Sequence, residues 1–305
     1  MIYSSFNQLV TKVRDDAGRR KVVAVVAADD SHTLEAATRA SRDGILTTRL
    51  IGPKKKIREL LSALDEDPAS YEIIAAEDPV GAAHVAAGLV RDREVDFVMK
   101  GKIQTADLLR AMLAPESGVR TGRMLSHLAI AEIPNHHKLI GITDVAITIA
   151  PNLDQKREII ENAAAALAGM GFDPPKVALL SASETINPKM IETVEAAELA
   201  KSNREGWLSE CIVEGPLSYD LAMSREAAEI KGIASRVCGD ADLLVVPHIT
   251  VGNVLLKALR YSAGALSAGI VVGGRVPIVL TSRAVETRDK FLPLVLAASM
   301  SAESS

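Results

Sequence analysis

A serine, an arginine and an aspartate near the end of the chain have the types and spacing of a group-transfer site. Thr281, Ser282 and Arg283 follow the apolar run 276–280 directly, and Asp289 comes seven residues after Ser282. A serine and an arginine at the end of a strand can hold a phosphate or an oxyanion, and a carboxylate at the start of the next helix can accept a proton. A surface loop followed by an aspartate that caps a helix explains the same pattern.

A second candidate segment begins at Lys100, where the apolar run 95–99 gives way to a helical pattern. Ligands bind beyond the carboxyl ends of parallel strands, and a helix N-terminus favours phosphate. Thr105 can cap this helix and hydrogen-bond an anion, while Arg110 can donate two hydrogen bonds to phosphate oxygens. We therefore predict that Lys100, Thr105 and Arg110 bind substrate. A capped helix with solvated basic residues remains an alternative, and no GxxxxGK[ST] phosphate loop is present.

A third segment, 240–253, also runs from a strand into a helix and contains Asp240, Asp242 and His248. The two aspartates precede the strand and His248 follows it, so they lie ~20 Å apart along an extended chain. One metal ion cannot bridge that distance. We therefore predict no metal site.

Strands and helices that alternate along the chain must position these segments. Short β-branched runs followed by helical patterns are typical of βαβ units, and they predict a parallel sheet covered by helices on both faces. The polar turn 134–137 joins two strand-like runs and predicts a hairpin. Expected strands are 22–28, 48–51, 73–76, 95–99, 125–133, 138–142, 177–180, 212–214, 243–246, 270–272 and 276–280; expected helices are 31–44, 54–64, 80–93, 154–169, 189–202, 219–231, 253–262 and 288–300.

The sequence predicts an α/β fold with two domains, one formed by 1–140 together with 275–305 and the other by 141–274. The chain has 305 residues and a net charge of −4, without the basic surplus of a nucleic-acid-binding protein. It shows no signal-peptide pattern and no apolar run long enough to span a membrane. Two cysteines, Cys211 and Cys238, fit a reducing compartment. We expect a cytoplasmic protein without a nucleic-acid or membrane partner.

Taken together, the segments resemble the phosphate acetyl/butyryltransferase (phosphotransacetylase) family over about residues 95–300. Several short motifs in one order make a chance agreement improbable, and the TGRMLSH part is more similar to the butyryl-type enzymes. The motifs are MKGKIQTADLLRA (99–111), VRTGRMLSH (119–127), ITDVAITIAPNLDQK (142–156), EGPLSYDLA (214–222), ADLLVVPHITVGN (241–253) and IVLTSRAVETRD (278–289).

The resemblance implies two α/β domains flanking a cleft, in an arrangement similar to the isocitrate and isopropylmalate dehydrogenases, and usually a homodimer. His248 departs from the family, which commonly has asparagine there, and no counterpart of its coenzyme A-binding arginine is found near the N-terminus. The implied roles are catalysis by Ser282, Arg283 and Asp289, and substrate binding by Thr105 and Arg110, which match the acyl-phosphate segment, and by Asn253.

The implied reaction moves a short acyl group, acetyl or butyryl, between coenzyme A or acyl-CoA and phosphate or acyl phosphate. Coenzyme A is then a substrate, and no permanently bound cofactor is expected. A free thiol has a pKa of ~8.5, so only a small part is ionised at neutral pH. Asp289 can act as the base if a closed cleft raises its pKa from ~3.9. Ser282 and Arg283 would stabilise charge at the carbonyl and on the leaving phosphate.

Two other functions remain open at this point. A metal-dependent decarboxylating dehydrogenase of the same fold needs clustered aspartates and a nicotinamide site, and the sequence shows neither pattern. A non-catalytic anion-binding protein needs neither Arg283 nor Asp289. Formation of a thioester from an acyl phosphate and coenzyme A distinguishes all three functions.

Overall fold

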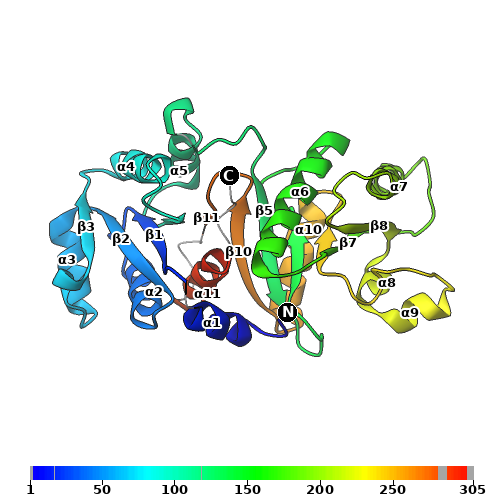
Figure 1. The fold of residues 1–305 in the computed structure, drawn as a ribbon, viewed down its shortest axis with the longest axis horizontal. Coiled ribbons are helices and arrows are strands. Elements are labelled where there is room, and N and C mark those ends of the chain that lie inside the picture. The colour runs from blue at the N-terminus through cyan, green and yellow to red at the C-terminus, as the bar shows by residue number, and fades with distance from the viewer. Residues whose placement is uncertain (1–2, 17, 118, 281–286, 301–305) are drawn as a thin grey trace. The chain divides into compact units, whose positions relative to one another are not determined.

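The computed structural model describes residues 3–16, 18–117, 119–280 and 287–300 (Figure 1). The chain forms two compact units. The central unit comprises Met124–Ser267 with Met1–Ser5, and the flanking unit comprises Phe6–Arg123 with Ala268–Ser305; both names refer to position in the sequence. These units differ from the expected domains at residues 1–5, 124–140 and 268–274. The expected domain division stays a prediction, as does the cleft.

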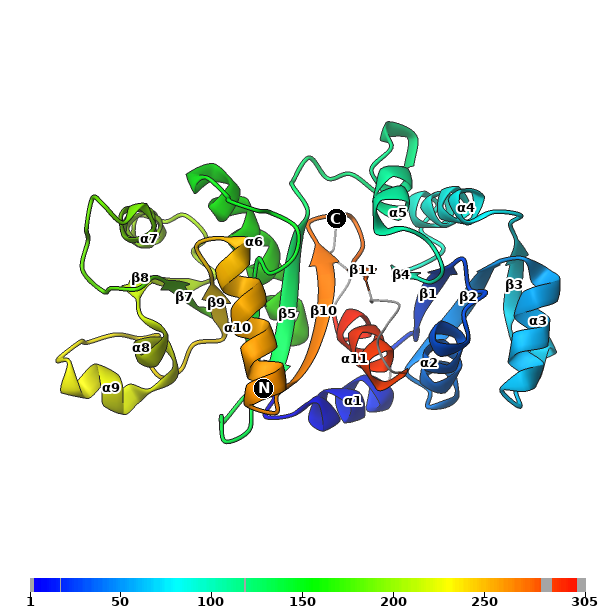
Figure 2. The same cartoon turned by 180° about the vertical axis from the view of Figure 1, so that it is seen from behind.

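The flanking unit contains a mostly parallel sheet with the strand order β3-β2-β1-β4-β11-β10. Only the β10–β11 pairing is antiparallel among the pairings described within it. Helices α4 and α5 lie on one side of this sheet, and α2 and α11 lie on the other (Figures 1 and 2). The elements are α1 Phe6–Asp15, β1 Lys21–Val26, α2 Ser31–Arg42, β2 Leu46–Gly52, α3 Lys54–Ala63, β3 Glu72–Ala75, α4 Pro79–Arg91, β4 Phe97–Lys100, α5 Thr105–Met112, most of β10 Leu266–Val272, β11 Ile278–Val279 and α11 Thr287–Ala298.

Local sequence explains the elements of the flanking unit. All four residues of β4 are buried, as are the last four of β1, and apart from Lys100 at the end of β4 these buried residues are apolar, as a strand covered on both faces requires. These observations confirm the predicted βαβ series. Helix α1 was not predicted, although Phe6 and Leu9 form its buried side. Helix α2 begins after Asp30, whose carboxylate caps the helix by accepting the Thr33 N–H at 2.9 Å.

The central unit contains strands in the order β5-β6-β9-β7-β8. Strands β5 and β6 pair antiparallel, with Ala129 opposite Ile142, which confirms the predicted hairpin. The remaining pairings in this order are parallel. The elements are β5 Ser126–Glu132, β6 Ile140–Thr143, α6 Leu153–Met170, β7 Lys176–Leu180, α7 Ile191–Arg204, β8 Ile212–Leu217, α8 Tyr219–Met223, α9 Arg225–Ile230, β9 Leu243–Val245 and α10 Ile249–Ser262.

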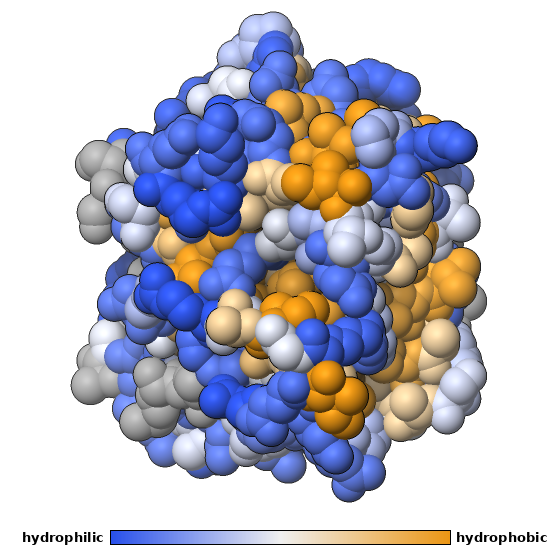
Figure 3. All heavy atoms as spheres, turned by 90° about the vertical axis from the view of Figure 1, so that its right-hand side faces the viewer, coloured by the Kyte–Doolittle hydropathy of each residue, from blue (hydrophilic) through white to orange (hydrophobic). Residues whose placement is uncertain are grey.

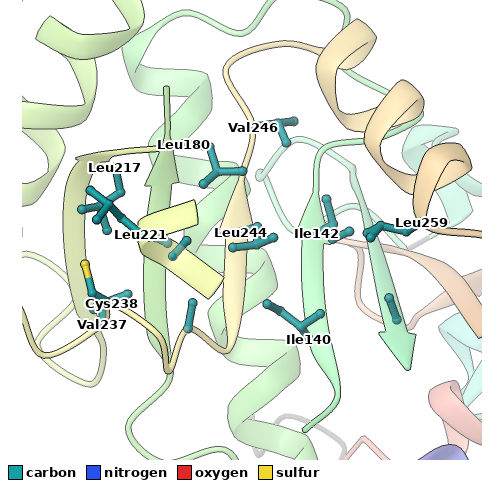
Figure 4. Packing of buried hydrophobic residues seen from close by; sticks show 14 of the residues in the cluster. Ile140, Ile142, Leu180, Leu217, Leu221, Val237, Cys238, Leu244, Val246 and Leu259 are labelled. Atoms are coloured by element: carbon teal, nitrogen blue, oxygen red, sulfur yellow. The ribbon is translucent and has the colours of Figure 1, made fainter. Parts of the chain in front are cut away.

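An aliphatic core joins the sheet of the central unit to helices α8, α9 and α10. Figure 4 shows Ile142 and Leu244 on neighbouring strands, with Leu221 from α8 and Leu259 from α10. All four side chains are at least 92% buried. Burial of a leucine or isoleucine side chain stabilises a fold by about 1.5–3 kcal/mol, so this layer contributes much of the stability of the central unit.

Two helices of the central unit differ from the sequence prediction. The helix expected over 219–231 is divided into α8 and α9. Ser224 is extended there, and its side chain accepts the Ala227 N–H at 3.2 Å, so it starts a new helix. The helix expected over 253–262 begins earlier, at Ile249. Asn253 therefore lies inside α10.

Exposed apolar side chains occur in separate patches on a mostly hydrophilic surface (Figure 3). Ile186, Ile191 and Ile230 are examples, each more than 60% exposed. Scattered exposure of this kind is ordinary for a folded protein. In the part of the chain that the structure describes, no helix is long and apolar enough to cross a membrane.

Gly101 allows the ends of β1 and β4 to meet closely. A Cβ atom at Gly101 would lie 2.4 Å from the Ala27 carbonyl oxygen and 2.6 Å from that of Val26. The Gly101→Ala variant is therefore expected to lose about 1–3 kcal/mol of unfolding free energy, measured by chemical denaturation. Gly88→Ala in α4 is the control: its Cβ would meet nothing nearer than 3.8 Å, so about 0.5–1 kcal/mol of gain is expected. Equal stability of both variants would contradict this packing.

Candidate functional site

Three neighbouring parallel strands of the flanking unit end at the same edge. Val26 of β1 lies opposite Lys100 of β4, and Val279 of β11 lies opposite Met99. Residues 27–30, residues 101–105 and residue 280 therefore follow neighbouring strand ends at this edge. This edge is where open α/β sheets bind ligands.

Lys100 is a buried cation at this edge. It is 5% exposed, and its Nζ lies 3.4 Å from the Gly101 carbonyl oxygen. Next to it, the Gly101 and Lys102 N–H groups donate to the Val26 and Ala27 carbonyls at 2.8 and 2.9 Å. The tight turn also holds Ala27 at a φ of 53°, in the left-handed region that a residue with a Cβ adopts at a cost.

Two further lysines at this edge surround Asp29. The Lys56 and Lys102 Nζ atoms lie 3.3 and 3.6 Å from Asp29 Oδ2. Both lysine side chains are about half exposed, whereas Asp29 is mostly buried. Each can therefore contact a dissolved anion without leaving its carboxylate partner. The sequence prediction missed these residues, although two consecutive aspartates directly after a buried strand were an available signal.

Thr105 and Arg110 both lie on α5, and their roles in substrate binding stay predictions, although Thr105 is not the helix cap that the sequence suggested. Gln104, not Thr105, occupies the N-cap position, and Thr105 is the exposed first residue of the helix. The Arg110 side chain is 76% exposed, and its Nη1 donates to Asp107 Oδ1 at 2.7 Å, one turn back. An exposed pair of this kind contributes little to stability, so Arg110 is available to an anion.

The predicted catalytic residues follow β11. Ser282 and Arg283 lie outside the described residues. Asp289 lies in the first turn of α11. The residue after it, Lys290, is 97% buried, and its Nζ contacts Asp30 Oδ2 at 2.9 Å and Thr33 Oγ1 at 3.0 Å.

The Asp30–Lys290 ion pair joins three elements. Asp30 follows β1 and caps α2, whereas Lys290 belongs to α11. Burial opposes ionisation of Asp30, but hydrogen bonds from Thr33 and Lys290 and the charge of Lys290 outweigh it and lower its pKa. Asp30 is therefore an anion at neutral pH. The pair was not predicted from the sequence, because a lysine on the apolar side of a helix gives no sign of its partner.

In the central unit, a loop anchored by Asp144 follows β6. The Asp144 carboxylate accepts the N–H groups of Ala146, Ile147 and Thr148 at 2.9, 3.0 and 3.1 Å. Asn253 Nδ2 lies 3.4 Å from the Val145 carbonyl oxygen, at the limit of a hydrogen bond. Asn253 therefore contacts the backbone of a second motif, and its role in substrate binding stays a prediction.

His127 lies on β5, opposite this loop. It is 91% buried, and within the described residues its Nδ1 has no hydrogen-bond partner. The same holds, among these residues, for the buried Thr148 Oγ1 and Asn162 Oδ1. Burial lowers the pKa of His127 to about 4, although the negative charge of Asp144 acts in the opposite direction. His127 is therefore neutral at physiological pH.

The site residues thus fall into two groups. Lys100, Thr105 and Asp289 come from elements of the flanking unit, as does Arg110. Asn253 belongs to the central unit. Over the described ranges, no group of three or more histidine, cysteine or carboxylate residues could hold a metal ion.

Comparison with known proteins assigns this chain to the acyltransferases. The sequence model of the phosphate acetyl/butaryl transferase family matches residues 75–298. The phosphate acetyltransferase of Thermotoga maritima is 41% identical over 281 residues, which cover 92% of this chain and 95% of that protein. The phosphate butyryltransferase of Clostridium acetobutylicum is 39% identical over 294 residues, 96% of this chain and 97% of that one. The chain belongs to the phosphate acetyl/butyryltransferase family.

Solved structures agree with this assignment. A branched-chain phosphotransacylase from Enterococcus faecalis superposes with a TM-score of 0.81 at 35% identity, over 92% of this chain and 98% of that one. A 4-hydroxythreonine-4-phosphate dehydrogenase from Salmonella typhimurium, described as putative, has a TM-score of 0.59 at 13% identity, over 93% of this chain and 100% of that one. The second likeness concerns the fold alone. The mixed α/β class is confirmed, and dehydrogenase-like folds are its more distant neighbours.

His127 is expected to make stability fall in mild acid. Because its pKa is about 4 when folded and ~6.5 when unfolded, only the unfolded chain gains a proton between these values. Stability therefore falls as pH drops from ~6.5 to 4, by up to about 3 kcal/mol. His127→Gln should remove this part of the pH dependence of unfolding, and the exposed His84→Gln should keep it. The same pH profile in both variants would contradict the assignment.

Proposed function

We propose that this chain transfers a short acyl group between coenzyme A and inorganic phosphate. The supporting observation is the register of β4 between β1 and β11, which brings the Lys100 segment and the strand leading to Ser282 and Arg283 to one edge. Lys56, Lys100 and Lys102 make this edge cationic. Phosphate and the phosphates of coenzyme A are the anions that such an edge attracts.

In the proposed reaction, the carboxylate of Asp289 takes the proton from the thiol of coenzyme A. The thiolate attacks the carbonyl carbon of the acyl phosphate, and a carbon–sulfur bond forms. Arg283 and Ser282 stabilise the negative charge on the carbonyl oxygen and the leaving phosphate. The carbon–oxygen bond to phosphate then breaks, and the proton on Asp289 passes to phosphate or to solvent. No covalent enzyme intermediate is needed.

The base role requires a balance of two effects on Asp289. A position in the first turn of α11 favours the ionised carboxylate through the helix dipole, by ~0.3–1 kcal/mol at exposed sites. Desolvation in the substrate complex acts in the opposite direction and can raise a carboxyl pKa by several units. Desolvation can be the larger of the two effects, so a pKa of Asp289 near neutrality, as the base role requires, is physically feasible.

Relatives of this chain include both acetyl and butyryl enzymes, so acetyl and butyryl are both candidate acyl groups. We infer in addition a cytoplasmic homodimer. Exposed apolar side chains recur on one face of α10, at Val251, Val254 and Tyr261, and a second copy of the chain would cover them.

The proposed reaction is tested by mixing the purified chain with coenzyme A and either acetyl phosphate or butyryl phosphate. Thioester and free phosphate should appear in equal amounts. A dehydrogenase would instead reduce a nicotinamide cofactor, and an anion-binding protein would bind phosphate without turnover. Binding without thioester formation from either acyl phosphate would contradict the proposal.

Arg283→Ala is expected to lower turnover by about 10²–10³-fold, the range for removal of one oxyanion-stabilising group. Arg283→Lys should recover only part of the activity, because an ammonium group cannot donate two parallel hydrogen bonds. Arg14→Ala, which removes an exposed arginine of α1, is the control and should keep full activity. Near-normal turnover in Arg283→Ala would show that the site is wrongly assigned.

Asp289→Asn is expected to lower kcat by about 10²–10⁴-fold at neutral pH, with a smaller effect on KM for either substrate. The deficit should shrink as pH rises, because more of the thiol is then ionised in solution. Asp154→Asn, in the first turn of α6, is the matched control for a carboxylate at a helix start. If both variants were equally active, Asp289 would be only a residue of the helix terminus.

A further inference from the structure

The first turn of α11 depends on side-chain contacts more than an ordinary helix start does. Pro293 lies inside α11 and has no N–H group to donate to the carbonyl of Asp289, four residues earlier. One backbone hydrogen bond of this turn is therefore missing. The buried Lys290 ammonium, bonded to Asp30 and Thr33, supplies a fixed contact in the same turn.

The partners of Lys290 are themselves fixed. Thr33 is 99% buried, and both its N–H and its hydroxyl group donate to Asp30. Helix α11 also packs along α2, where the Arg39 guanidinium lies 4.3 Å from the centre of the Phe291 ring. The position of the turn that contains Asp289 is thus set from the N-terminus of α2 and the end of β1.

Charge gives this ion pair a second effect. Lys290 is the chain neighbour of Asp289, and an uncompensated ammonium there would lower the pKa of the proposed base. For unit charges ~8 Å apart near a protein surface, the effect is roughly one pKa unit. The Asp30 carboxylate lies 2.9 Å from Lys290 Nζ, and its negative charge opposes that field.

We propose that Asp30 and Lys290 form a positioning pair for the acyl-transfer reaction: Lys290 holds the first turn of α11, and Asp30 neutralises Lys290 so that the adjacent base keeps a usable pKa. This proposal rests on the proposed role of Asp289. Neither residue of the pair needs to touch a substrate.

Removal of either charge of the pair is expected to shift the kcat–pH profile, and the two shifts should have opposite directions. Asp30→Asn leaves the Lys290 charge uncompensated and should move the acid limb of the kcat–pH profile down, by about half a unit to one unit. Lys290→Met leaves the Asp30 charge and should move that limb up by a similar amount. The double variant Asp30→Asn/Lys290→Met removes both charges and should return the limb close to its original position.

The substitutions are chosen to keep the fold. Asparagine is as good an N-cap as aspartate, so Asp30→Asn should retain the start of α2. Methionine keeps most of the apolar stem of Lys290. The other charged groups at this edge and on α2 are unchanged in every variant, so their influence cancels in the comparison; they include Asp29, Lys56, Lys100, Lys102, His32, Glu35, Arg39 and Arg42.

Lys138→Met is the matched control for loss of a buried lysine. Lys138 Nζ lies 2.5 Å from Asp242 Oδ1 in the central unit, and its side chain is fully buried. This variant should lower the midpoint of unfolding without moving the acid limb. A contribution that is only structural would act in the same way in Asp30→Asn and Lys290→Met.

The experiment measures kcat and KM for thioester formation from pH 5 to 9, with the unfolding midpoint of each variant. Opposite shifts in the single variants, and their cancellation in the double variant, would support the proposal. An unmoved limb in both single variants, with Asp289→Asn inactive, would overturn the positioning role alone. Normal activity of Asp289→Asn would overturn the base assignment and the positioning role with it.

Discussion

The parallel pairing of β4 with β1 on one side and β11 on the other is the constraint on which the proposed site depends. Parallel strands end at one edge, so residues distant in the sequence leave the sheet there together. The end of β1 supplies Asp29 and Asp30, the end of β4 supplies Lys100 and Lys102, and β11 leads to the serine–arginine pair. The close approach at Gly101 fixes the first two ends against each other.

In the central unit, the ends of parallel strands also bring separate segments together, although the residues there differ. Its parallel strands β6 and β9 end beside the Asp144 loop and the start of α10. A Cβ atom at Gly252 would lie 2.8 Å from the Asp144 carbonyl oxygen, so only glycine lets the helix lie this close to the loop. Two of the motifs that identify the family therefore pack directly on each other, and part of their pattern serves structure.

Much of the fold was predictable because it depends on local patterns. Apolar runs such as 22–28 and 95–99 gave β1 and β4, and the polar turn at 134–137 gave the hairpin. The ion pair of Asp30 with Lys290 was not predictable, since the partners are 260 residues apart and meet only through the sheet. The division of 219–231 into two helices was also not predicted, because a serine such as Ser224 is compatible with both a helix interior and a helix cap. The roles of Ser282 and Arg283 came from the family resemblance and stay predictions.

The location of the reaction can be measured directly. A crystal structure of the Asp289→Asn variant with coenzyme A and an acyl phosphate should hold both substrates together, because the variant binds them but turns over slowly. The phosphate group is expected beside Lys100 and Arg283, at the carboxyl ends of β4 and β11, with the thiol near residue 289. Both substrates bound away from this edge, in a variant that is still inactive, would contradict the account.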